Sequence, residues 1–186
     1  MKKHEGGTPS AGHYDLLLRL CVLPQAINVL HHDDAHGPHT VEYIFHELCG
    51  NQCFGLRKAA YLIDNPDFDM VRGVAGYACD GYVSKAASHD NDSCMKHFAS
   101  HLQECDFNES VRELQHGSVS RNGQTEQEIA QQLAKLFGFS DPQVIIWEVQ
   151  NDNNGVFVYE GDEAKMQELR DWLVHGMHLL SLCPTA

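Results

Sequence analysis

The sequence predicts a mainly α protein of the α+β class, with an N-terminal helical bundle followed by a small α-β-β-α portion that contains one β-hairpin. Two observations favour this class. Apolar residues recur at intervals of three or four through most of residues 14–105, which is the period of an amphipathic helix. Two runs rich in β-branched residues, QVIIWEVQ and VFVYEG, then flank the turn-forming segment NDNNG, which is typical of a hairpin.

The predicted division of the chain follows its composition. Residues 1–12 are polar and glycine-rich and are expected to form a flexible tail, and residues 13–116 are expected to form the helical region. A loop at 117–124 leads to the α-β-β-α portion at 125–186, which we expect to pack on the helical region as one domain. A chain of 186 residues is long enough for one domain with a full core.

Proline and glycine separate the first two predicted helices. One helix spans about residues 14–32, with a kink at Pro24. The next opens at Pro38, which suits the first turn of a helix. It either ends at Gly50 or continues to Ile63.

Two further helices are predicted before the loop. Residues 67–87 have a helical pattern that is weakened by Gly73, Gly76 and Gly81, and such small residues allow close helix contact. Residues 91–105 form a second amphipathic helix.

Local signals define the C-terminal elements. Thr125 and Glu128 form a capping box that opens a helix, and Gly138 ends it. The hairpin follows, and a last helix covers about residues 162–180. Because two strands alone are marginal in water and both faces of this hairpin are apolar, the hairpin is expected to pack on helices or to pair in a homodimer.

The charge balance limits the partners of the protein. Asp and Glu number 26 against 13 Lys and Arg, so the formal net charge is −13. A surface of that sign repels phosphate backbones and anionic membranes, so we expect no nucleic acid and no membrane as partner. Cations and basic proteins remain as partners that this charge permits. Seven cysteines without a compact disulfide framework, and no recognisable signal peptide, predict a cytoplasmic location.

A stripe of potential metal ligands runs along the helix that opens at Pro38. His39, Glu42, His46 and Cys49 fall within one arc of that helix. Residues three or four positions apart on a helix can reach the same ion, and imidazole, carboxylate and thiolate are all zinc ligands. Cys53 would join this stripe if the helix continued beyond residue 50.

The predicted helix at 91–105 has a similar stripe. Cys94, His97, His101 and Cys105 share one arc, and the two histidines have the spacing that a shared ion needs. Metal sites in helical bundles are built from facing helices. The mixed set of N, O and S donors suits Zn²⁺, whereas a subset of histidines and carboxylates would suit Fe or Mn.

A short segment upstream offers a secondary hypothesis. The segment VLHHDDAHGPHT, residues 29–40, resembles the HD-domain phosphohydrolases, in which a His-Asp doublet is followed by a further His and a Pro. This resemblance covers about a dozen residues. It implies an all-helical, metal-dependent phosphohydrolase with an upstream His, for which His13 is the candidate, and a downstream Asp, for which Asp80 and Asp106 are candidates.

Two functions are therefore predicted. The first is a divalent-metal-binding helical protein, which, if it is an enzyme, would hydrolyse phosphate or related esters with Asp33 as general base. Its predicted ligands are His39, Glu42, His46, Cys49, His97 and His101. The alternative is a non-enzymatic acidic adaptor with a basic protein partner. The first requires that the two stripes face each other, whereas the alternative predicts that they point apart into solvent.

Overall fold

One antiparallel sheet of four strands forms the centre of the computed structural model, with the strand order β2-β1-β4-β3. The structure describes residues 40–51, 53–78, 98, 101–102, 105–114, 124–149 and 152–181. The strands are β1 (Lys58–Asn65), β2 (Met70–Ala78), β3 (Gln143–Glu148) and β4 (Asn154–Glu160). The inner strands β1 and β4 pair along their length although about a hundred residues separate them in the sequence.

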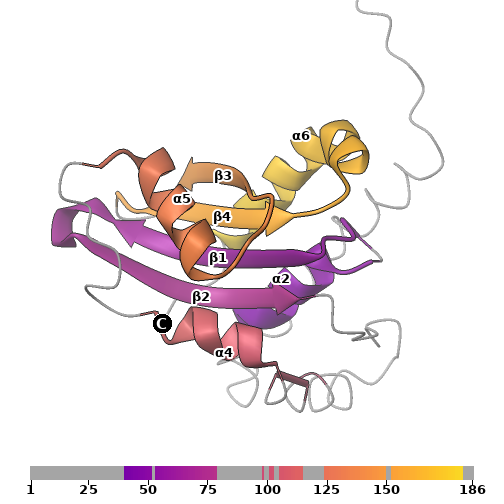
Figure 1. Cartoon of the computed structure of the whole chain (residues 1–186), viewed down its shortest axis with the longest axis horizontal. Helices are drawn as coiled ribbons and strands as arrows, with labels where there is room; N and C mark the ends of the chain where they lie inside the picture. The colour runs from indigo at the N-terminus through magenta and orange to yellow at the C-terminus, as the bar shows by residue number, and fades with distance from the viewer. Residues whose placement is uncertain are drawn as a thin grey trace, which may run out of the picture.

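Helices cover both faces of the sheet (Figure 1). The helices are α2 (Thr40–Cys49), α4 (Asp106–Arg112), α5 (Glu126–Leu136) and α6 (Glu163–Leu180), and the 3₁₀ turn η2 (Pro66–Phe68) joins β1 to β2. One core cluster joins α2 and α6 to one face of the sheet, and a second joins α4 and α5 to the other. Among the helices in the described ranges, none is both long and apolar enough to cross a membrane.

The predicted fold class is wrong, because the region expected to form a helical bundle supplies two of the four strands. β1 lies where the helix that opens at Pro38 was predicted either to continue or to have already ended. As an inner strand it is covered on both faces, and Ala60, Tyr61 and Leu62 are all buried. Such a strand lacks the alternation of apolar and polar residues that distinguishes a strand from a buried helix in sequence. The all-helical fold that the HD-domain resemblance implied is likewise absent from the described residues.

The predicted helix at 67–87 is also wrong over its described residues, where β2 is a strand. The glycines of this segment do permit close contact with a helix, but they lie in the strand β2 and the helix is α4. A Cβ on Gly73 would lie 1.7 Å from the backbone oxygen of Val111 in α4, and one on Gly76 would lie 2.9 Å from the Cα of Asn108. β2 and α4 can therefore touch backbone to backbone only where side chains are missing.

The C-terminal elements lie where the sequence places them. The Thr125 capping box opens α5, Gly138 has a φ of 64° just after it, and β3, β4 and α6 follow. Both faces of the β3–β4 hairpin are covered within the chain: Trp147 packs in the α2–α6 core and Val158 in the α4–α5 core. The apolar faces that suggested a homodimer are thus explained without one, and the homodimer stays a prediction.

Candidate functional site

Three of the seven predicted site residues lie outside the described residues, namely Asp33, His39 and His97. The four that the structure describes are Glu42, His46 and Cys49 on α2, and His101. The helix α2 ends at Cys49, and the amide of Gly50 donates to the His46 carbonyl oxygen at 2.8 Å. The stripe therefore stops there, which removes Cys53 from it.

His46 lies against the outer edge of the sheet. Its ring is buried, and Nε2 lies 2.9 Å from the carbonyl oxygen of Gly76 on the edge strand β2. A carbonyl can only accept a hydrogen bond, so Nε2 carries the proton and donates. In the neutral ring the lone pair is then on Nδ1, which is also a buried atom. The sheet edge thus fixes both the orientation and the tautomer of this imidazole.

The second stripe meets the first at this point. The His46 and His101 ring centres are 5.5 Å apart with the planes at 75°, and the rings of Tyr43 and Phe98 are 5.1 Å apart. Phe98 also lies 5.2 Å from the His46 ring. The two stripes therefore meet through one described residue of each, His46 and His101.

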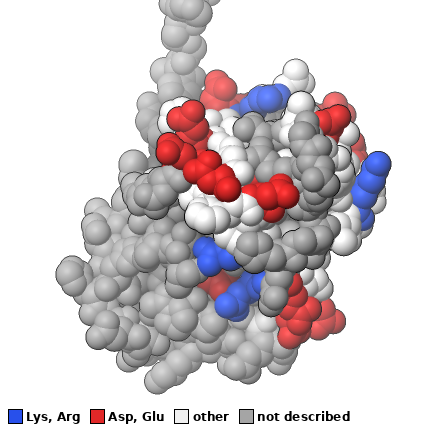
Figure 2. Space-filling view, turned by 90° about the vertical axis from the view of Figure 1, so that its left-hand side faces the viewer, with Lys and Arg blue, Asp and Glu red and all other residues white. Residues whose placement is uncertain are grey.

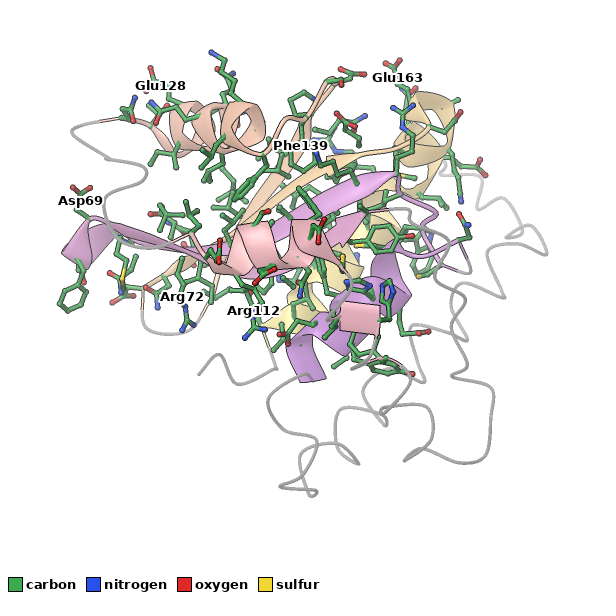
Figure 3. All side chains as sticks on the ribbon, turned by 60° about the horizontal axis from the view of Figure 1, so that its bottom comes forward. Asp69, Arg72, Arg112, Glu128, Phe139 and Glu163 are labelled. Carbon is green, nitrogen blue, oxygen red and sulfur yellow. The ribbon has the colours of Figure 1, made fainter. Side chains whose placement is uncertain are left out.

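Glu42, one helical turn before His46, has a different partner. Its carboxylate is buried and lies 3.3 Å from the guanidinium of Arg112. Arg112 is labelled in Figure 3, at the end of α4. The Arg112 side chain is 48% exposed, so water reaches one side of the pair. This ion pair ties α2 to α4 across the edge of the sheet. A carboxylate engaged in this way is a poorer candidate for a metal ligand than the spacing alone indicated.

Cys49 belongs to the core. Its side chain is fully buried, and this burial, with a smaller contribution from the neighbouring Cys53, raises the pKa of the Cys49 thiol well above its usual value. Metals bind the thiolate form of cysteine. At neutral pH Cys49 is protonated and packs as a small apolar residue.

Two imidazoles thus remain at the contact between the stripes. Within the described ranges, no three side chains of His, Cys, Asp or Glu come close enough together to hold a metal ion by themselves. What the arrangement offers is one histidine with a fixed tautomer and a second histidine in ring contact with it. Imidazole pairs of this kind can bind a borderline metal, exchange protons, or simply pack.

Sequence reasoning missed the groups that hold these residues in place. The Gly76 carbonyl, Asn108 and Arg112 all lie on elements that the sequence placed elsewhere or did not predict. Asn108 accepts a hydrogen bond from the Gly76 amide at 2.9 Å, on the same outer edge of β2 that His46 contacts. Since these partners are 30 to 70 residues from α2 in the chain, no local pattern could have indicated them.

Comparison with known proteins adds no assignment: no protein-family model matches the sequence, and no curated protein matches it.

Proposed function

We propose that this protein binds a divalent metal ion, with Zn²⁺ as the best match, through His46 and His101. The observation that supports this proposal is the contact between the two histidine-bearing segments at 5.5 Å. Two imidazoles that share a zinc ion at Zn–N distances of about 2.0–2.1 Å have ring centres roughly 5 Å apart. The observed separation is close to that value.

The surroundings of His46 fit this role. Metal-bound histidines usually donate their second ring nitrogen to a carboxylate or a backbone carbonyl, which fixes the tautomer. The bond from Nε2 to the Gly76 oxygen has this form, so the ligand atom that we propose is Nδ1. With imidazole donors alone, zinc is favoured over Mg²⁺ and Ca²⁺, which prefer oxygen.

The proposed chemistry follows from the small number of protein ligands. An ion held by two imidazoles has positions for water or for a substrate oxygen, and a bound metal supplies acidified water and charge stabilisation. We therefore extend the proposal to hydrolysis of a phosphate or related ester. The cytoplasmic location, which the cysteine pattern predicts, is compatible with it and stays a prediction.

The deciding experiment is elemental analysis of the untagged chain after incubation with Zn²⁺ and desalting. We expect about one zinc per chain in the wild type and a loss of bound zinc in His101→Ala and in His46→Gln. His178→Ala is the matched control, because His178 is also a helical histidine in contact with an aromatic ring, that of Trp147. It should retain the zinc.

A stability measurement separates metal binding from packing. Zinc at 100 times its Kd should raise the free energy of unfolding by about 2.7 kcal/mol in the wild type and the control, and by less in the two site variants. If zinc neither binds nor stabilises the folded wild type, His46 and His101 are an aromatic contact only, and the proposal is wrong. With zinc bound, hydrolysis of p-nitrophenyl phosphate and of its diester, lost on adding a chelator, would test the reaction.

A further inference from the structure

The turn between β1 and β2 exposes a large aromatic side chain. Phe68, the last residue of η2, is 71% exposed, and the other exposed large hydrophobic residue of the described ranges is Leu136 at 55%. The two strands pair up to Asn65 and Met70, so the turn stands at the end of the β1–β2 ladder, which has one register shift further back, between Tyr61 and Leu62. Figure 1 shows this end of the hairpin projecting beyond the helices on the left.

Hydrogen bonds within the turn hold this aromatic group in a defined place. The Asn65 side chain accepts from the amides of Asp67 at 3.1 Å and Phe68 at 3.2 Å. Pro66 fixes its own φ, and its carbonyl accepts from the amide of Asp69. A turn whose backbone is already fixed in this way loses little backbone freedom when it binds, which favours affinity.

Asp69 adopts a left-handed conformation, with φ 51° and ψ 40°. Glycine takes this conformation without steric cost, whereas aspartate does so at some cost and adds a negative charge. Asp67 and Asp69 thus flank Phe68 in the sequence with two carboxylates, and both residues are exposed. Figure 2 views the molecule from this end, and its described surface has more acidic than basic side chains.

We propose that this turn is a docking element, in which Phe68 enters an apolar pocket on a partner protein and the two aspartates face Lys or Arg side chains on the rim of that pocket. Aromatic anchors in desolvated pockets dominate many protein interfaces. The charge of the turn and the net charge of −13 select a basic partner over a second copy of this chain, which would bring the same carboxylates together. An anionic membrane is disfavoured for the same reason.

The first step of the test introduces p-benzoylphenylalanine as a photo-cross-linker at position 68 of the full chain, with position 136 as the matched site. Leu136 is also an exposed apolar residue, but it follows a lysine in place of lying between aspartates. Both proteins are irradiated in an extract of the cells that make this chain. We expect one protein to cross-link from position 68 only, through a peptide that contains Lys or Arg beside apolar residues.

The second step measures the affinity of the purified partner for variants of the turn. Phe68→Ala should weaken binding roughly tenfold or more, because the anchor is removed, while Leu136→Ala binds like the wild type. Asp67→Asn with Asp69→Asn should also weaken binding and should reduce its dependence on salt. Since the three side chains are exposed, circular dichroism of each variant should match the wild type.

Several results would overturn the proposal. These are no cross-link from position 68, the same protein cross-linked from position 136, a cross-link to a second copy or to lipid, or a contact peptide without basic residues. The proposal would also be overturned by a partner that binds Phe68→Ala as tightly as the wild type. The outcome does not depend on the metal experiment, because the turn and the His46–His101 contact are separate features of the hairpin and of α2.

Discussion

Helices α4 and α5 cover the same face of the sheet but are held there by different means. α5 has 11 residues and a complete capping box, in which Thr125 and Glu128 satisfy each other's backbone amides. α4 has only 7 residues, and its N-cap residue Cys105 makes no side-chain cap hydrogen bond. A helix as short as α4 is not stable on its own in water. Its stability must therefore come from the surfaces on which it packs.

The backbone of β2 provides part of that support, in addition to the apolar contacts of the buried Val111. Gly73 and Gly76 let α4 approach within direct contact, and Asn108 of α4 accepts from the Gly76 amide. α5 instead rests on apolar side chains such as Ile129 and Leu133, which are fully buried. The comparison indicates that α4 and the edge strand β2 form one cooperative unit, whereas α5 has a helical tendency of its own. His46 contacts the same edge of β2, so the candidate site depends on the less autonomous of the two helices.

The largest effect is expected from Gly73→Ala. The new Cβ would lie 1.7 Å from the Val111 carbonyl oxygen, and a helix backbone cannot move aside locally. We expect a loss of about 3 kcal/mol or more in the free energy of unfolding, measured by urea denaturation. In the comparison variant Gly155→Ala, the new Cβ meets the Trp147 indole at 2.5 Å, so the clash is with a buried side chain and not with a helix backbone. A loss below about 1 kcal/mol in Gly73→Ala would show that α4 can move away from β2 and is not tied to it through the backbone.

Asn108→Ala should have the next largest effect. The substitution leaves the Gly76 amide, at a buried position, without its acceptor, which typically costs about 1–3 kcal/mol. Tyr159→Phe is the control on the opposite side of the sheet, because it removes a part-buried bond of 3.0 Å from the Tyr159 hydroxyl to Gln143, whose side chain can turn to water. Hydrogen exchange at the Gly76 amide should accelerate in Asn108→Ala only. Unchanged exchange at Gly76 would mean that water replaces the Asn108 oxygen and that the α4–β2 unit is looser than the structure indicates.

The same contrast explains which elements could be predicted from the sequence. α5 is encoded locally, since Thr125, Glu128 and Gly138 are signals that act within one helix. The glycines of β2 have no local meaning as strand residues. Gly73 and Gly76 weaken a helix and a strand alike, and their purpose appears only when α4 lies against them.

The candidate site was predictable in part for the same reason. Helical spacing puts Glu42 and His46 one turn apart on α2, and the structure brings the His46 ring against that of His101. The role of these residues as a site stays a prediction. The partners of these residues were not predictable. Arg112 and the Gly76 carbonyl come from α4 and β2. No sequence pattern predicted α4, and a helix was predicted where β2 is a strand. A helical wheel gives the direction of a side chain but not the element that it meets.

The smallest expected effect concerns the cap of α5 and its dependence on pH. Hydrogen bonds from the backbone amide of Thr125, at 2.8 Å, and from its hydroxyl lower the pKa of the Glu128 carboxyl from its ordinary value of 4.5. The folded state therefore favours the ionised form. This contribution to stability is fully present above pH 4.5 and is lost as the pH falls through the lower pKa of the folded state.

Glu128→Gln tests this direction of the pH dependence, because glutamine preserves the shape of the capping box but does not ionise. We expect the wild type to be slightly more stable than Glu128→Gln at pH 7, and this difference to shrink as the pH falls below 4.5, measured by urea denaturation. Asn108→Ala is the reference, since its cost involves no titrating group and should change little over the same range. If the difference for Glu128→Gln did not depend on pH, the carboxylate would not stabilise α5 through its charge. The local stability of α5 would then rest on the Thr125 hydroxyl, which accepts from the Glu128 amide at 3.3 Å. The difference in local stability between α5 and α4 would then be smaller.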